Sequence, residues 1–138
     1  MHLKISTDYA VRIVLYLAKK RQLVQSKELS EQLHIPQGYV LKVASILKEA
    51  QILEAVTGID GGFRLVKHPR DIPIYDVIRA METTMQINRC LEKDRYCSRD
   101  AGSFCQVRHF YEKIQSYLDH MLLSTSIQEL LEMELREI

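Results

Sequence analysis

Three cysteines are the residues of this chain with the most distinctive chemistry. Cys90, Cys97 and Cys105 fall within 16 residues, at the spacing Cys-x6-Cys-x7-Cys, and complete the cysteine content of the chain. An odd cluster of this kind favours metal binding or redox chemistry over a disulfide framework. Thiolates are preferred ligands of iron–sulfur clusters, and loop positions allow three of them to converge. Two alternatives stay open: reduced thiols without a ligand role, and a structural zinc site, although such sites usually contain cysteines about two to four residues apart.

A second set of residues is suited to binding a polyanion. Residues 1–70 contain 11 Lys and Arg against 6 Asp and Glu, a net charge of 11 − 6 = +5, whereas residues 71–138 contain 8 against 12, or −4. The basic half favours a partner such as double-stranded DNA. Candidate DNA-contacting side chains off the apolar stripe of one predicted helix are Gln37, Tyr39, Lys42 and Lys48. The alternative for these residues is an ordinary solvated helix face.

The elements expected to position these basic residues follow the order of a winged helix. Apolar periodicity and turn residues predict helices over Thr7–Lys20, Lys27–Leu33 and Gln37 to about Gln51, then strands over Ile52–Val56 and Phe63–Val66. Ser26 is the expected N-cap of the second helix, and Pro36 separates it from the third. A helix-turn-helix followed by a hairpin wing places the third helix in the major groove and the wing along the backbone or minor groove.

The C-terminal half is expected to carry the cysteines and a long helix. A further helix is predicted from Ile74 to Met81, a loop from about Ile87 to Gly102, and a long amphipathic helix over Ser103–Leu123. A helix of this length, followed only by the short segment Ser126–Glu137, is expected to pack against the same helix of a second chain. We therefore divide the chain into a DNA-binding domain, residues 1–70, and a cysteine-loop and dimerisation region, residues 71–138.

Several of these motifs together resemble the Rrf2 family of winged-helix regulators, whose iron–sulfur members include IscR and the nitric-oxide sensor NsrR. The resemblance rests on Ser6-Thr7-Asp8-Tyr9-Ala10-Val11-Arg12, the helix-turn-helix, the wing Gly61-Gly62-Phe63-Arg64-Leu65 and the cysteine loop before a long helix. It implies a homodimer built on that helix, with an iron–sulfur cluster held by the cysteines, whose state alters DNA binding. Arg64 resembles the wing residue that reaches the minor groove. Family wings usually carry a basic residue where Thr57 stands, and Asp60 adds a negative charge to the tip.

The resemblance supplies two candidates for a fourth cluster ligand. Asp8 matches the Thr-Asp-Tyr motif from which the nitric-oxide-sensing branch draws a carboxylate of the opposite subunit. His109 resembles the histidine of the IscR branch, but it follows the last cysteine by four residues where that branch has three, a rotation of ~100° around a helix. We therefore favour Asp8. The alternatives are a helix-terminal acid for Asp8 and a surface histidine for His109.

Other functional classes are disfavoured by the sequence. The longest apolar run is far shorter than a membrane span of ~20 residues, and no signal peptide precedes it, so we expect a cytoplasmic protein without a membrane partner. Phosphate-loop, Gly-x-Ser-x-Gly and His-Glu-x-x-His motifs are absent, which argues against an enzyme with a small-molecule substrate. We predict a mainly α-helical, homodimeric DNA-binding transcriptional regulator. It is controlled by a two-iron or four-iron cluster that senses nitric oxide, redox state or iron status. The alternative is a thiol-based redox or zinc-binding dimer.

Overall fold

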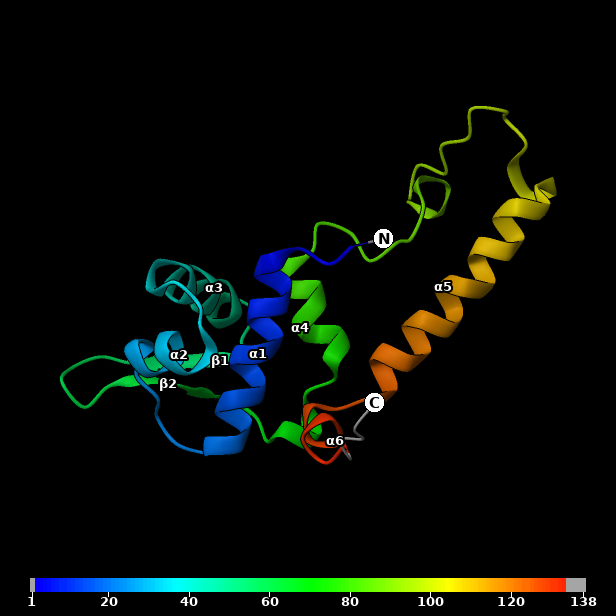
Figure 1. The fold of residues 1–138 in the computed structure, drawn as a ribbon. Coiled ribbons are helices and arrows are strands. Elements are labelled where there is room, and N and C mark those ends of the chain that lie inside the picture. Colours follow the sequence, from blue (N-terminus) through cyan, green and yellow to red (C-terminus); the bar gives the residue numbers. More distant parts are fainter. Residues whose placement is uncertain (1, 134–138) are drawn as a thin grey trace.

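The structure is a computed structural model that describes residues 2–133, except for the side chain of Ser103. In chain order its main elements are α1 (Ile5–Lys20), α2 (Ser26–Leu33), α3 (Gln37–Glu49), β1 (Leu53–Val56), β2 (Gly62–Leu65), α4 (Ile74–Met81), α5 (Gln106–Ser124) and α6 (Ile127–Leu131). Short 3-10 turns η1 (Pro69–Asp71), η2 (Arg89–Leu91) and η3 (Gly102–Phe104) lie in the connections. The prediction of a mainly helical winged helix with a hairpin wing is confirmed (Figure 1).

One apolar core holds the helices and the hairpin together. Helix α1 lies at its centre and packs against α3, α4, α6 and β2. Its buried side chains meet apolar residues from both halves of the sequence, among them Leu29, Val40, Leu47, Leu53, Ile72, Val77 and Ile127. We call residues 5–81 together with α6 the winged-helix body. The division of the chain at residue 70 stays a prediction about function, because this core includes residues on both sides of it.

The wing is an antiparallel hairpin that is tied to the segment before α2. Leu53 pairs with Leu65 and Glu54 with Arg64, so the Glu54 and Arg64 side chains share one face of the hairpin. Val24 and Phe63 exchange two backbone hydrogen bonds, each of 2.9 Å. Gly62, at φ +155°, lies so close to this segment that an added Cβ would stand 2.5 Å from the carbonyl oxygen of Val24. A glycine is therefore required where the wing meets the body.

Three helix starts differ from their predictions. Helix α1 begins at Ile5 and not at Thr7, and the starts of α2 and α5 differ for local reasons. Ser26 is the first residue of α2 and not its N-cap, because Gln25 holds the extended backbone of the cap position. The Ser26 hydroxyl instead accepts a hydrogen bond from Gln37 Nε2 at 3.3 Å, which joins α2 to the start of α3. The long helix starts at Gln106 and not at Ser103, because Cys105 has an extended backbone at φ −90° and ψ 114° and caps α5.

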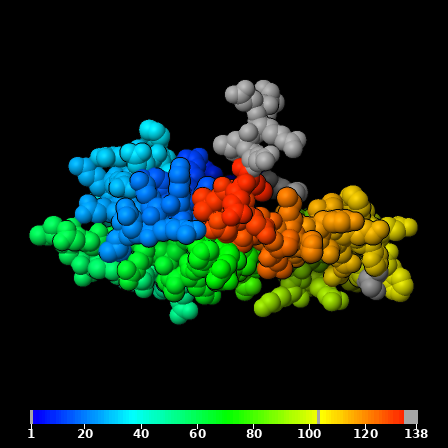
Figure 2. All heavy atoms as spheres, turned by 90° about the horizontal axis from the view of Figure 1, so that it is seen from below, coloured from blue at the N-terminus to red at the C-terminus, as the bar shows by residue number. Residues whose placement is uncertain are grey.

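Helix α5 and the segment before it extend away from the body as an arm (Figures 1 and 2). We call residues 82–105 the cysteine loop, and the cysteine loop with α5 the arm. Among the residues of α5, Gln115 alone is buried, whereas Tyr117 and Met121 are 78% and 65% exposed. Within the described part of the chain, no helix is long and apolar enough to cross a membrane. The apolar side of α5 is thus left open to solvent in a single chain.

Candidate cysteine site and DNA-binding surface

The three cysteines line one cavity in the arm. This cavity, of about 280 Å³, lies between the cysteine loop and the first turns of α5, and Cys90, Cys97 and Cys105 all contribute to its wall. Each thiol is half-buried and none is in a disulfide. Within the residues that the structure describes, no group of three or more His, Cys, Asp or Glu side chains is placed to hold a single metal ion. The fold thus brings the three cysteines to the wall of one cavity from separate turns of the chain, without placing them around a single metal position.

Each sulfur has a different local setting. Cys90 Sγ accepts a hydrogen bond from Asn88 Nδ2 at 3.2 Å, and Cys105 Sγ accepts one from the backbone N–H of Arg108 at 3.4 Å, at the start of α5. Backbone N–H groups of Ala101 and Arg99 point at the Cys97 thiol and lower its pKa below the ordinary value, against a smaller opposing effect of desolvation. Cys97 is therefore the thiol that its surroundings shift toward the thiolate, which is the form that binds metals and reacts.

An ion pair between Arg89 and Asp94 braces the part of the cysteine loop that contains Cys90. Arg89 binds both carboxylate oxygens of Asp94, at 2.6 and 2.5 Å, and its guanidinium lies 5.6 Å from the ring centre of Tyr96. The hydrogen bonds that Arg89 donates to Asp94 lower the pKa of Asp94 and raise the pKa of Arg89. Because both side chains are more than half exposed, solvent screens this pair and its role is geometric. A bidentate arginine–carboxylate contact fixes orientation, so it shapes the loop on which Cys90 and Cys97 stand.

Gln115 joins the cysteine loop to α5, and the sequence analysis did not single it out. Its Oε1 accepts the backbone N–H of Ile87 at 2.8 Å, while Nε2 donates to the carbonyl oxygen of Met85 at 2.9 Å and to Asp119 Oδ1 at 2.8 Å. The side chain is almost fully buried. The only sequence signal was an amide next to the apolar stripe of a long helix. A buried amide needs hydrogen-bond partners, but the sequence does not say which ones it finds.

The two fourth-ligand candidates lie outside the cysteine cavity of their own chain. Asp8 is on the exposed side of α1, where its carboxylate contacts Arg12 at 2.6 Å. His109 is on an exposed part of α5, with Nδ1 3.5 Å from Glu112 Oε2. Neither residue lines the cavity, whose α5 contributions are Val107, Arg108 and Tyr111. For Asp8 this placement agrees with a role toward a second chain, and both ligand assignments stay predictions.

A line of side-chain contacts connects Asp8 to the third helix. Arg12, the ion-pair partner of Asp8, lies 5.7 Å from the ring centre of Tyr9. The Tyr9 ring meets the ring of Tyr39 edge to face, with centroids 5.9 Å apart. Tyr39 stands near the N-terminal end of α3 and is about half exposed. This line of contacts joins Asp8 to a candidate base-contacting residue.

The predicted DNA-contacting residues lie on the surface of the winged-helix body. Tyr39, Lys42 and Lys48 are exposed on α3, opposite the buried stripe of Val40, Val43, Ala44 and Leu47. Gln37 is also exposed, although its amide is engaged with Ser26. Arg64 stands on β2 rather than at the wing tip, and its guanidinium is paired with the carboxylate of Glu54 across the hairpin. To contact DNA, Arg64 thus has to leave Glu54 or bind Glu54 and the DNA at the same time.

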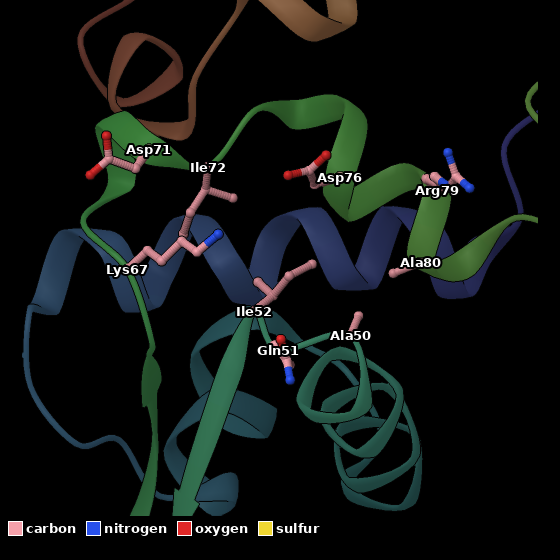
Figure 3. A pocket seen from close by; sticks show the side chains of 9 residues that line it. All are labelled: Ala50, Gln51, Ile52, Lys67, Asp71, Ile72, Asp76, Arg79 and Ala80. Atoms are coloured by element: carbon pink, nitrogen blue, oxygen red, sulfur yellow. The ribbon is translucent and has the colours of Figure 1, made fainter.

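A separate cavity of about 310 Å³ lies between the turn that joins α3 to β1, the segment after β2, η1 and α4 (Figure 3). Ile52 and Ile72 contribute apolar wall, and the charged residues around it are Lys67, Asp71, Asp76 and Arg79. Two cations and two carboxylates balance at this cavity. It therefore lacks the excess positive charge that favours a polyanion.

Comparisons with known proteins agree with this arrangement. The family described as "Rrf2: Iron-dependent Transcriptional regulator" matches residues 3–133. The HTH-type transcriptional regulator NsrR of Bacillus licheniformis is 31% identical over 117 residues, which cover 82% of this chain and 80% of the relative. CymR, the global cysteine regulator of B. subtilis, has a similar fold, with a TM-score of 0.78 at 21% identity over 96% of this chain and 97% of that one. T. potens IscR has a TM-score of 0.74 at 22% identity, covering 96% and 87%.

The helix-turn-helix, the hairpin wing and these likenesses define a winged-helix, DNA-binding transcriptional regulator. The chain belongs to the Rrf2 family, as its motifs indicated. Members of this family regulate transcription and are not enzymes, which confirms the functional class predicted from the sequence.

Proposed function

We propose that this chain is a homodimeric transcriptional regulator whose DNA binding responds to an iron–sulfur cluster held by Cys90, Cys97 and Cys105. The observation that carries the proposal is the shared cavity, whose wall includes three free cysteines from different turns of the chain. Sulfur donors of this kind fit a two-iron or four-iron cluster, and the thiolate-favouring surroundings of Cys97 support metal binding. When bound, such a cluster would react with nitric oxide or oxygen, and the site would stay unfilled when iron is scarce.

The open apolar side of α5 supports the homodimer. Its residues Val107, Phe110, Ile114, Tyr117 and Met121 follow one another at intervals of three, four, three and four, which is the spacing of a coiled-coil seam. Most of them are exposed in the single chain. Covering them with the same helix of a second chain removes this apolar surface from water. The second chain also offers an Asp8 as a fourth ligand, which we favour over His109.

The response of the chain follows from its contacts. A cysteine loop that is released from its ligand is free to move against α5, to which Gln115 attaches it. A released Asp8 alters the line through Arg12 and Tyr9 to Tyr39. Either change shifts the dimer between arrangements in which two α3 helices do or do not match successive major grooves. There, Gln37, Tyr39 and Lys42 contact base edges and phosphates. Lys48 contacts a phosphate, and Arg64 reaches the minor groove from the wing.

The proposal is tested by anaerobic purification followed by absorption spectroscopy and by iron and sulfide analysis. We expect visible absorbance and stoichiometric iron and sulfide in the wild-type dimer, and loss of both in each of Cys90→Ser, Cys97→Ser and Cys105→Ser. Asp8→Ala should destabilise the cluster more than His109→Ala does. Equal iron content in the wild type and all three serine variants contradicts the ligand set, and the reverse order of the last two variants identifies His109 as the fourth ligand.

A thiol-based regulator without a cluster is the second candidate, and the lowered pKa of Cys97 favours it. A thiolate that lines a cavity with two further cysteines is suited to reaction with a thiol oxidant. Such an oxidant, by taking up two electrons, would join it to a second cysteine as a disulfide once the loop brings the two sulfurs together. The same purification separates the candidates. Protein that lacks iron and sulfide, but whose DNA binding changes reversibly with a thiol oxidant and a reductant, supports the thiol mechanism. Stoichiometric zinc in its place supports a zinc-binding dimer.

A further inference from the structure

The tip of the wing presents an isolated apolar side chain. Ile59 is 92% exposed, the largest exposed fraction of any aliphatic side chain recorded as exposed in the described residues. Its backbone is held in place: Gln25 Nε2 donates to the Ile59 carbonyl oxygen at 3.0 Å, and Gly61 N–H donates to the Gly58 carbonyl oxygen at 3.2 Å. Gly58 adopts φ +108°, a conformation that other residues rarely take, and so permits this turn. The wing thus holds an isoleucine in water at the end of a fixed hairpin.

The charges of the wing argue against a phosphate-binding tip. Residues 53–65 contain one cation, Arg64, and two carboxylates, Glu54 and Asp60, a net charge of 1 − 2 = −1. Arg64 is paired with Glu54 on the strands, away from the turn. The turn itself carries Asp60, which repels phosphate. The turn therefore offers no positive charge to the DNA backbone, although the wing of a winged helix lies against DNA.

We propose that Ile59 is an apolar wedge that enters the minor groove and partly unstacks a base step. Proteins that bind the minor groove insert aliphatic side chains in this way and kink the duplex. Single exposed apolar residues are common on protein surfaces, so exposure alone does not carry the proposal. It is carried by three facts together: the position at the wing tip, the anchored backbone beneath it, and the absence of a cation from the turn. The inference rests on the proposed function, in which the wing faces DNA.

This role makes two predictions that a charged contact does not share. A wedge releases no counterions, so its removal lowers affinity without changing the dependence of affinity on salt. Unstacking is easiest at pyrimidine–purine steps. Ile59 should therefore favour a TA or CA step at the position that the wing tip enters, although the wing contacts no base edge there. The wing then influences sequence choice through deformability of the duplex.

The experiment titrates the full-length protein, in the state that binds DNA, against a duplex carrying the palindromic site that the wild type selects from its own upstream region. Affinity is measured at several salt concentrations, and DNA bending by energy transfer between end labels. We expect Ile59→Ala to weaken binding roughly ten-fold, from the apolar surface lost on truncation, with an unchanged salt slope and a smaller bend. Ile59→Leu should retain both affinity and bend. Val66→Ala, an exposed apolar change outside the turn, is the matched control and should bind like the wild type.

Asp60→Lys provides the contrast within the same turn. It should tighten binding with a steeper salt slope and no change in the preferred step, because it adds a phosphate contact. Binding of Ile59→Ala equal to that of the wild type overturns the wedge, and so does a weakening that disappears at high salt. Absence of wild-type binding to any duplex overturns the proposed function itself. If Tyr39→Ala and Lys42→Ala lose binding while Ile59→Ala binds like the wild type, the proposed function stands and only the wedge is overturned.

Discussion

The winged-helix body and the arm are held together by different forces. In the body, apolar side chains such as Ile13, Val40 and Leu47 are fully buried in one core. In the arm, the buried residue of α5 is a glutamine, and the cysteine loop is fixed by its amide and by the Arg89–Asp94 pair. Burial of apolar surface is cooperative and largely insensitive to its chemical surroundings, whereas a few polar contacts hold only while each partner stays in place.

This difference suits two separate roles, in which the body contacts DNA and the arm responds to a ligand. A body with a continuous core keeps the spacing between α3 and the wing constant, which contact with DNA requires. The arm contributes no residue to the buried apolar core of the described chain, so its order depends on what it contacts. In the proposed function, these contacts are a second α5 and a group bound by the cysteines. Regions that open at low free energy are those in which a ligand most readily changes the structure. The predictions below test whether the arm depends on its contacts while the body does not.

The largest effect is expected from a charge on the open side of α5. Tyr117→Glu places a carboxylate in the proposed seam, where it would be desolvated without a partner, so the protein should sediment as a monomer at micromolar concentration. Affinity for a palindromic site should fall by roughly 10²-fold or more, because the two half-sites are no longer bound together. Tyr117 is 78% exposed in the single chain, so thermal unfolding of the body should be unchanged.

Ser116→Glu is the matched control, since it adds the same charge to an exposed position on a different side of α5. It should remain dimeric. A Tyr117→Glu protein that sediments as the wild-type dimer contradicts the proposed interface, and with it the mechanism in which two α3 helices move relative to each other.

In the body, surface substitutions should change DNA binding only where the side chain contacts DNA. Tyr39→Ala and Lys42→Ala should each cost roughly 1–3 kcal/mol of DNA binding and change which base is preferred, if these residues contact base edges. Lys48→Ala should weaken all sequences about equally and reduce the salt slope by ~1, as expected for a phosphate contact. Equilibrium titration on the palindromic site and on point variants of it distinguishes the two patterns. Unchanged affinity and preference in the first two variants would show that α3 is not the recognition helix.

The same contrast explains what could be predicted from the sequence. Body elements were predictable because apolar periodicity fixes which side of α1, α3 and α4 is buried, and local turn residues mark the wing. The contacts of the arm were not: Gln115 meets Met85 and Ile87 across about thirty residues, and Arg89 meets Asp94 only after the loop has folded. The clustering of the three cysteines predicts a common site, and that site stays a prediction. The distinct setting of Cys97 had no sequence signal, because it depends on backbone N–H groups, which every sequence contains.

The attachment of the cysteine loop gives the next prediction. Gln115→Ala leaves the Ile87 N–H and the Met85 carbonyl without their partner, at a cost of roughly 1–3 kcal/mol that is confined to the arm. Amide exchange of Ile87 should accelerate by a corresponding factor, and visible absorbance should be lost sooner in air, while exchange in α1 and α3 stays slow. Gln106→Ala, an exposed change on the same helix, is the control. Equal acceleration in the arm and the body would show that the two regions unfold as one unit.

The smallest effect concerns the pH dependence of Cys97 in the cluster-free protein. The N–H groups of Ala101 and Arg99 lower the pKa of this thiol, so the folded loop gains stability from the thiolate above the pKa of the unfolded thiol, and loses it as the pH falls through the lower folded value. In the Cys90→Ser/Cys105→Ser variant, alkylation of Cys97 should reach half its maximal rate at a lower pH in buffer than in denaturant, where the backbone donors are dispersed. Arg99→Gln should raise that pH only slightly, because it removes the minor charge effect and keeps the backbone N–H. Superimposable profiles in buffer and denaturant would show that the folded loop does not hold the backbone N–H groups around Cys97. The arm would then be ordered only by its contacts in the proposed dimer.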